Sequence, residues 1–384
     1  MTLYLDVSAG VNVSSGLGRY SRSLTHALIP HLEKPPALFY NTIEGRTKPM
    51  AGLENLPAMR VKLGYKAWRM AVWMGQLTGR DFRRLTPGVS IFHAMEHLLM
   101  PLNRQPKVAT IMTVHDLIFE LFPEHHKTLN HLFLTRAMPL FVRRADAIIT
   151  VSQASKHDLI QHYGTPAEKI TVVYEAADAH FQPPTPEKIA EVRAKYHLPE
   201  QYLVVVGAIE PRKNYSRLVE ALMILREKHP DLKLVVVGSK GWLYEPFFER
   251  IEELRAGEHV IFPGYVPDED LPAVYGAATI TVMASVYEGF GLPILEAMAC
   301  GSPVVCSQSS SLPELGGEVA HYFDPFNIEA MVAGLDGVLG DEALQQKMRL
   351  AGPPQAAQFS WERAARETIG VYEQIAGVEL SKIP

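Results

Sequence analysis

The sequence predicts an α/β protein built from two doubly wound parallel sheets. Short β-branched runs alternate with helical stretches along all 384 residues, and this pattern occurs twice. Runs such as 234–237 are apolar without interruption, which is typical of parallel strands covered on both faces. The chain is long enough for two domains of about 150–200 residues. Helical crossovers of right-handed sense then complete each sheet.

The expected strands form two sets of six. They are 3–7, 37–40, 91–93, 109–114, 147–151 and 170–173, then 202–206, 233–237, 260–262, 280–283, 303–305 and 320–323. A proline-rich linker at 182–186 separates the sets, which places domains at 1–180 and 181–362. A last helix follows Ser360, a residue suited to a helix N-cap.

Composition places the chain among ordinary globular proteins, with 47% hydrophobic and 21% charged residues. The sequence contains no run of 18 apolar residues, so we expect no transmembrane helix. The N-terminus has the pattern of a first strand rather than a signal peptide. The two cysteines, Cys300 and Cys306, fit a reducing compartment and offer no metal-ligand spacing. We therefore expect a cytoplasmic protein.

The net charge of −5 is unevenly distributed. Residues 1–180 carry 20 Lys and Arg against 14 Asp and Glu, whereas the remainder carries 17 against 28. A basic first half can face an anionic acceptor or a membrane surface. The overall negative charge does not favour nucleic acid as a partner.

The most informative stretch is 288–296, Glu-Gly-Phe-Gly-Leu-Pro-Ile-Leu-Glu, which follows an expected buried strand. Gly289 and Gly291 let the backbone approach a ligand, and Pro293 suits the start of a helix. The N–H groups of a helix start favour an anion, while the two carboxylates accept hydrogen bonds from hydroxyls. A ligand with phosphates and hydroxyls fits, and a nucleotide-sugar has both.

A second strand end carries Arg212 and Lys213, just before a helix expected to begin at the N-cap Asn214. Cations at this positive end of a helix dipole are unfavourable by ~0.3–1 kcal/mol each. A bound diphosphate would reverse the sign through charge-assisted hydrogen bonds. Two solvated surface cations are the alternative. The similar junction at 289–293 favours the diphosphate.

Two strand ends in the first half carry further candidates. Gly16 and Gly18 imitate the front of a dinucleotide fingerprint, but the acidic residue expected after the second strand is missing, which disfavours a nicotinamide cofactor. A flexible loop touching phosphate or acceptor and a plain turn both stay open. His115, followed by Asp116, is either a satisfied core residue or a proton-transfer group facing a ligand, and its place at a strand end favours the second role.

Two other segments also allow alternatives. Asp268-Glu-Asp270 has the form of a metal site, but helix capping is the better account and we assign no metal there. Residues 60–85 combine seven Lys and Arg with two Trp, so they resemble an interfacial amphipathic helix. A domain helix packing its stripe on the sheet is the preferred interpretation. The apolar positions of that stripe are Leu63, Ala67, Met70, Ala71, Met74 and Leu77.

The motifs Glu-Pro-Arg-Lys-Asn at 210–214 and Glu-Gly-Phe-Gly-Leu-Pro-x-Leu-Glu at 288–296 resemble the family 4 retaining glycosyltransferases of GT-B fold. Further matching pieces, in the right order along nearly the whole chain, are 16–18, 115–116, 151–155 and 359–361. The resemblance implies two Rossmann-like domains facing across a cleft, the first for the acceptor and the second for the donor. It also implies that a last helix, 363–384, crosses back to the first domain.

The resemblance assigns a role to each candidate residue. The expected ligands of the donor diphosphate are Arg212, Lys213, Gly289, Phe290, Gly291 and Leu292. Ribose and base would contact Glu296, Tyr265 and Val266. The catalytic group would comprise His115, Glu288 and Lys213, with His115 near the reaction centre and Glu288 accepting from the transferred sugar. The cleft would be lined by Gly16, Gly18 and Asp116.

The donor expectation depends on one departure from the family pattern. Many members carry Arg or Lys where this chain has Ala208, and chains with a small residue there and Gly-Trp-Leu as at 241–243 are similar to mannosyl- and rhamnosyltransferases of surface polysaccharide synthesis. The resemblance therefore implies GDP-mannose as the expected donor, with a saccharide or lipid-linked acceptor and no cofactor or metal. A peripheral position on the inner membrane face, through 60–85, is an open alternative to a purely cytoplasmic one.

The mechanism expected from the family retains the anomeric configuration. No two carboxylates identify themselves as nucleophile and acid/base, so front-face attack is preferred, with the departing phosphate oxygen taking the acceptor proton. Two other functions stay open: a sugar-nucleotide epimerase of the same fold, and a non-catalytic nucleotide-sugar-binding protein.

Overall fold

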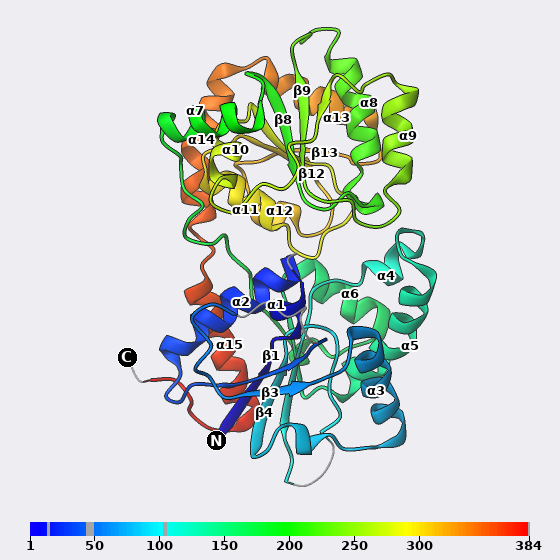
Figure 1. Ribbon diagram of the computed structural model, residues 1–384, viewed down its shortest axis with the longest axis vertical. Helices are drawn as coiled ribbons and strands as arrows, with labels where there is room; N and C mark the ends of the chain where they lie inside the picture. The colour runs from blue at the N-terminus through cyan, green and yellow to red at the C-terminus, as the bar shows by residue number, and fades with distance from the viewer. Residues whose placement is uncertain (14–15, 44–49, 103–105, 383–384) are drawn as a thin grey trace. The chain divides into compact units, whose positions relative to one another are not determined.

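The computed structural model describes residues 1–13, 16–43, 50–102 and 106–382 (Figure 1). It contains two compact units. The first unit comprises Met1–Glu120, Thr128–Glu175 and Ser360–Pro384, and the second unit comprises Leu121–Lys127 and Ala176–Phe359. The chain thus leaves the first unit near the expected boundary at residue 180 and re-enters it at its end. Residues 121–127 are grouped with the second unit, which the sequence pattern did not predict.

The first unit is built on a seven-stranded parallel sheet in the order β3-β2-β1-β4-β5-β6-β7. Its strands are β1 Thr2–Asp6, β2 Ala37–Asn41, β3 Ala58–Val61, β4 Val89–Ala94, β5 Ala109–Val114, β6 Ala147–Thr150 and β7 Ile170–Val172. Strand β3 was not expected, because this edge strand is short and partly exposed and so lacks a continuous apolar run.

Helices cover the first sheet and include the last helix of the chain. The α-helices are α1 Ser8–Asn12, α2 Gly16–Leu28, α3 Tyr65–Thr78, α4 Ile118–Leu121, α5 Thr128–Arg144, α6 Gln153–Tyr163 and α15 Trp361–Ala376, and the 3-10 helices are η1 Ile29–His31, η2 Arg83–Leu85 and η4 Ala167–Lys169. Helix α15 packs against α2 and the central strands (Figure 1). The N-cap prediction for Ser360 is confirmed, since its side chain accepts from the Arg363 N–H.

The second unit has a six-stranded parallel sheet in the order β10-β9-β8-β11-β12-β13. Its strands are β8 Tyr202–Val206, β9 Lys233–Val237, β10 Val260–Ile261, β11 Ile280–Met283, β12 Val304–Ser307 and β13 His321–Phe323. Its α-helices are α7 Pro186–Tyr196, α8 Tyr215–Leu225, α9 Glu245–Glu253, α10 Leu271–Gly276, α11 Leu292–Ala299, α12 Leu312–Gly316, α13 Ile328–Leu339 and α14 Glu342–Ala356, and its 3-10 helices are η3 Pro123–His125 and η5 Pro211–Lys213. Two doubly wound parallel sheets are therefore present, as predicted.

Helix α3 does not bury the stripe that its sequence suggests. Trp68 and Val72 enter the core, where the Trp68 ring lies 5.5 Å from that of Phe39. Met70 and Met74, which were expected to pack on the sheet, are 46% and 48% exposed. Over the described parts of the chain, no helix combines the length and apolarity that crossing a bilayer requires.

Candidate functional site

Two loops of the second unit meet at the carboxyl ends of neighbouring strands. Strand β8 leads into 207–214 and strand β11 into 284–291. The two strands pair in parallel, so both loops leave the sheet at the same edge. The Val286 N–H donates to the Arg212 carbonyl at 2.9 Å, which joins the loops directly.

The first loop places Lys213 against the sheet. Gly207 has φ +143°, a backbone conformation that L side chains rarely adopt, so glycine allows the turn that follows β8, and the Lys213 side chain lies beside this position. Helix η5 ends at Lys213. The next residue, Asn214, has a left-handed backbone conformation at φ +60° and directly precedes α8. The expected side-chain cap is wrong: Asn214 Nδ2 instead donates to the carbonyls of Ala284 (3.1 Å) and Pro325 (2.8 Å), because these loops offer buried acceptors.

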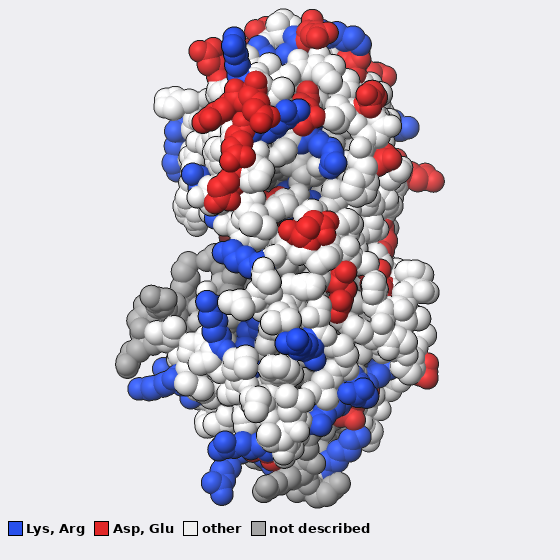
Figure 2. Space-filling model, turned by 90° about the vertical axis from the view of Figure 1, so that its right-hand side faces the viewer, with Lys and Arg blue, Asp and Glu red and all other residues white. Residues whose placement is uncertain are grey.

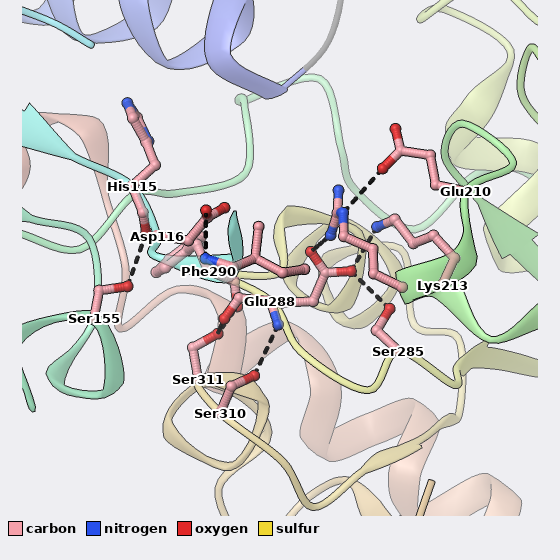
Figure 3. Close-up of polar contacts among 12 residues, drawn as sticks. His115, Asp116, Ser155, Glu210, Lys213, Ser285, Glu288, Phe290, Ser310 and Ser311 are labelled. Atoms are coloured by element: carbon pink, nitrogen blue, oxygen red, sulfur yellow. Dashed lines mark hydrogen bonds and ion pairs between the residues drawn. The ribbon is translucent and has the colours of Figure 1, made fainter. Parts of the chain in front are cut away.

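Glu288 accepts hydrogen bonds from both candidate cations (Figure 3). Lys213 Nζ donates to Glu288 Oε1 at 2.7 Å, and Ser285 Oγ donates to the same oxygen at 2.6 Å. Arg212 Nη1 donates to Glu288 Oε2, while its Nε donates to Glu210 Oε2 at 2.9 Å. Two cations and two carboxylates thus form one network at the strand ends.

Burial and charge act in opposite directions in this network. Burial raises the pKa of Glu288, but the charges of Arg212 and Lys213 outweigh it and hold that pKa at about 2. Burial raises the pKa of Glu210 despite the same two cations. Burial also lowers the pKa of Lys213, although Glu288 opposes this shift. The 2.7 Å contact indicates that Lys213 and Glu288 are both ionised, since each compensates the other's desolvation.

The second loop is held by two serines that sequence reasoning missed. Ser310 Oγ accepts from the Glu288 N–H at 2.9 Å, and Ser311 Oγ donates to the carbonyls of Glu288 and Phe290 (Figure 3). The run of serines at 309–311, directly after β12, was the available signal, because strand ends in such sheets line ligand sites.

Helix α11 begins at Leu292, directly after this loop. Gly291 occupies the N-cap position with φ +119°, and Pro293 is the second helical residue. The described helix therefore starts where an anion site was predicted, although the binding of phosphate by Gly289, Phe290, Gly291 and Leu292 stays a prediction.

The residues predicted for ribose and base lie in three different environments. Glu296, on α11, is buried and accepts from the Tyr275 hydroxyl at 2.8 Å. Val266 is buried, whereas the neighbouring Tyr265 is 86% exposed. The Tyr275 contact was not anticipated and shows that Glu296 is already oriented by a neighbouring helix. Ribose contact stays a prediction for Glu296, Tyr265 and Val266.

The capping role expected within 268–270 is wrong for Asp270. Its carboxylate accepts from Lys188 and Lys195 of α7, at 2.8 and 2.7 Å, and from the Tyr196 hydroxyl at 2.8 Å. These partners come from a helix distant in sequence, so local capping patterns could not reveal them.

In the first unit, His115 follows β5 and both of its ring nitrogens face acceptors. Nδ1 lies 3.3 Å from Glu175 Oε1, and Nε2 lies 3.1 Å from the Met95 carbonyl oxygen. Burial lowers the pKa of His115, but its hydrogen bond to Glu175 and that carboxylate's charge outweigh this, and the net shift is upward. A doubly protonated imidazole donates to both acceptors.

The other first-unit candidates have structural partners as well. Asp116 Oδ1 accepts from the Ile118 N–H at 3.2 Å. Gly16 and Gly18 lie in the first turn of α2, so the expected loop or plain turn is wrong at these positions. A Cβ on Gly18 would come 2.0 Å from the Val13 carbonyl oxygen, which explains the glycine by close backbone approach.

Within the ranges that the structure describes, no three His, Cys, Asp or Glu side chains gather closely enough to hold a metal ion. The expectation of a reaction without metal or cofactor stays a prediction.

Comparisons with known proteins cover both units. The family described as "Glycosyltransferase Family 4" matches residues 16–181, and "Glycosyl transferases group 1" matches residues 188–353. The O-antigen chain mannosyltransferase B of Escherichia coli is 36% identical over 265 residues, which are 68% of this chain and 70% of that protein. The serotype-specific mannosyltransferase WbdA of Escherichia coli is 29% identical over 280 residues, 69% of this chain but only 33% of that longer protein.

Solved structures share the fold over nearly the entire chain. Sucrose-phosphate synthase from Thermosynechococcus elongatus superposes with a TM-score of 0.79 at 21% identity, covering 98% of this chain and 99% of that one. WaaG, a glycosyltransferase involved in lipopolysaccharide biosynthesis, has a TM-score of 0.71 at 17% identity, covering 98% and 100%. At these identities the likeness concerns the fold alone.

Proposed function

The chain belongs to the family 4 glycosyltransferases of GT-B fold, and we propose that it transfers a mannosyl group from GDP-mannose to a saccharide or lipid-linked acceptor, with retention of configuration. The observation that carries this proposal is the pair of cations, Arg212 and Lys213, held at the carboxyl edge of β8 beside the start of α11. This combination of cations and helix N–H groups suits the binding of a sugar diphosphate.

The choice of mannose is supported by the relatives. The O-antigen chain mannosyltransferase B and WbdA both transfer mannose according to their names. This supports a role in surface polysaccharide synthesis for the present chain.

The leaving diphosphate determines what the residues must do. The bond from sugar C1 to the phosphate oxygen breaks, a bond from C1 to the acceptor oxygen forms on the same face, and the acceptor proton passes to the departing phosphate. Arg212 and Lys213 would stabilise the charge that develops on the phosphate. When the Arg212 and Lys213 side chains bind the diphosphate, the Glu288 carboxylate would lose their hydrogen bonds and accept hydrogen bonds from hydroxyls of the transferred sugar instead.

A donor screen tests the proposal. The protein is incubated with GDP-, UDP-, ADP- and dTDP-sugars, with and without mannose oligosaccharides, and products are identified by mass and by anomeric NMR coupling. We expect mannosylated product only from GDP-mannose, with the α configuration kept and the rate unchanged by EDTA. Isomerised donor without acceptor would indicate an epimerase, and binding without turnover would indicate a non-catalytic sensor.

Membrane contact through 60–85 is a separate part of the proposal. Lys66, Met70, Met74 and Leu77 follow one another at helical spacing on the exposed side of α3. The two methionines and Leu77, at 55% exposure, present apolar surface beside a basic side chain, which suits an anionic bilayer. On the face shown in Figure 2, Lys and Arg predominate over the first unit, while Asp and Glu gather over the second.

Vesicle flotation distinguishes this contact from simple exposure. The double variant Met70→Ser/Met74→Ser should lose binding to vesicles containing anionic lipid. The control Leu350→Ser, at a 70% exposed leucine of the second unit, should bind as the parent protein does. Equal flotation of all three proteins, or of none, would refute the contact.

A further inference from the structure

A second group of buried charges lies at the carboxyl edge of the first unit's sheet, and apart from His115 its members have been given no role so far. Asp6 ends β1 and is in register with Ala94 at the end of β4, and Glu96 follows two residues later. His115 follows the next strand, β5, and its Nε2 contacts the Met95 carbonyl. The strand order therefore brings three titratable side chains to one edge of the sheet.

Glu96 differs from its neighbours because its carboxylate is unpaired. The residue is 4% exposed, and among the residues that the structure describes it has neither a hydrogen-bond donor nor an ion-pair partner. Asp6, by contrast, accepts from the Ser8 N–H at 3.0 Å and from Ser8 Oγ at 2.5 Å. The Glu96 carboxylate, in a largely buried residue, therefore has no protein donor in the described part of the chain and is left to accept a hydrogen bond from a ligand.

Arg69, on α3, offers the complementary group. It is 9% exposed, its Nη1 donates to Asn130 Oδ1 at 2.7 Å, and its guanidinium lies 4.0 Å from the Phe133 ring centroid. Its Nη2 is buried and has no hydrogen-bond partner within the described ranges. The cluster therefore holds an unused donor and an unused acceptor that do not satisfy each other.

The charges of this cluster act on one another. Burial raises the pKa of Glu96 to about 7, the charge of Asp6 adds to the shift, and Arg69 and His115 oppose it. Burial likewise raises the pKa of Asp6 to about 6. The Arg69 guanidinium carbon also lies 5.1 Å from the centroid of the Tyr65 ring. Burial raises the pKa of Tyr65, the charges of Glu96 and Asp6 add to this shift, and Arg69 opposes it.

The chemistry of the cluster selects the kind of ligand. A phosphate would meet Arg69 favourably but would face the carboxylates of Asp6 and Glu96, and like charges at short range repel. A sugar hydroxyl both donates and accepts, so adjacent hydroxyls on one ring can satisfy Glu96 and Arg69 together.

We propose that Glu96 and Arg69 form the subsite for the acceptor sugar, binding neighbouring hydroxyls of the neutral terminal ring of the saccharide. This inference rests on the proposed transferase function and names its acceptor class. The acceptor is held by its sugar hydroxyls and not by a lipid phosphate.

The test compares Glu96→Gln and Arg69→Lys with the control Glu168→Gln, an exposed glutamate of the same unit. Initial rates are measured against mannose oligosaccharide and GDP-mannose, together with hydrolysis of GDP-mannose without acceptor. Glu96→Gln and Arg69→Lys should raise the acceptor KM about tenfold or more, as expected for a lost charge-assisted hydrogen bond. The donor KM and donor hydrolysis should match the control.

The outcomes separate this inference from the proposed function. If the parent protein transfers mannose but Glu96→Gln keeps the parental acceptor KM, the subsite is refuted while the function stands. Competition of inorganic phosphate with the saccharide, abolished in Arg69→Lys, would also refute it and indicate an anion site. Absence of transfer from GDP-mannose to both free saccharides and lipid-linked acceptors by the parent protein would refute the function itself. Saturation-transfer NMR measures saccharide binding directly, without turnover, and so applies even where a variant is inactive for other reasons. Loss of the saccharide's saturation-transfer signal in Glu96→Asp supports the subsite, and a signal equal to that of the parent protein contradicts it.

Discussion

Replacing Glu288 by glutamine removes the negative charge that two buried cations share. Glu288 is 6% exposed and accepts from Arg212, Lys213 and Ser285. Glutamine keeps the size of the side chain but directs an NH₂ donor toward a cation. The pKa of Glu288, held at about 2 against an ordinary 4.5, corresponds at 1.36 kcal/mol per unit to roughly 3 kcal/mol of stability at neutral pH.

The sign of this effect fixes its pH dependence. Because the folded-state pKa is depressed, the stabilisation is complete above about pH 4.5 and is lost as the pH falls toward 2. The Glu288→Gln variant should therefore be less stable than the parent protein at pH 7 by roughly 3 kcal/mol, and the difference should shrink at pH 3. A control, Glu253→Gln, removes a surface ion pair with Arg250 and should leave the unfolding midpoint almost unchanged.

The assay is urea unfolding of the full chain with and without GDP. Unfolding of the second unit is monitored by hydrogen exchange in peptides from 202–225 and 280–299. If a diphosphate takes over both cations, GDP should stabilise Glu288→Gln more than the parent protein, because the nucleotide restores the missing charge. Mannosyl transfer should nevertheless fall, since the sugar loses its acceptor group. A stability loss under 1 kcal/mol, or GDP stabilising the variant less than the parent, would refute the reasoning.

Three further predictions concern single side chains. Lys213→Ala should lower kcat by about 100-fold or more while circular dichroism stays unchanged, and Lys228→Ala, at an exposed ion pair, should turn over normally; parental kcat in the first variant contradicts the role. Gly291→Ala should lower the urea midpoint, at a cost of ~1–3 kcal/mol, because φ is +119° and the new Cβ would lie 2.8 Å from a leucine methyl; an unchanged midpoint argues against strain. Glu175→Gln should lower the pKa of His115, which NMR titration measures. An unchanged His115 pKa would show that the Glu175 carboxylate does not raise that pKa.

The sequence was sufficient to predict the parts of the site that follow from local pattern. Arg212, Lys213 and Glu288 could be assigned to strand ends because each follows an apolar β-branched run and precedes a helix start. The pairing of Lys213 with Glu288 could not be foreseen, since it depends on β8 and β11 being neighbours in the sheet. Sheet order arises from tertiary packing and leaves no local signal.

The errors have the same origin. Asn214 and Asp270 both have side chains that suit an N-cap, but partners distant in sequence bind them more favourably than the adjacent helix does. Met70 and Met74 were expected to pack on the sheet, whereas Trp68 and Val72 fill that position. The periodicity identified the helix but not which side of it faces the core.

Calorimetric titration with GDP, GMP and guanosine tests the central claim most directly, namely that Arg212 and Lys213 hold the diphosphate of the donor. GDP should bind the parent protein far more tightly than guanosine does, and Lys213→Ala should reduce that preference by about 10- to 150-fold, equivalent to a lost charge-assisted bond of ~1.5–3 kcal/mol, while guanosine affinity stays unchanged. A GDP preference equal in Lys213→Ala and the parent protein would contradict the account.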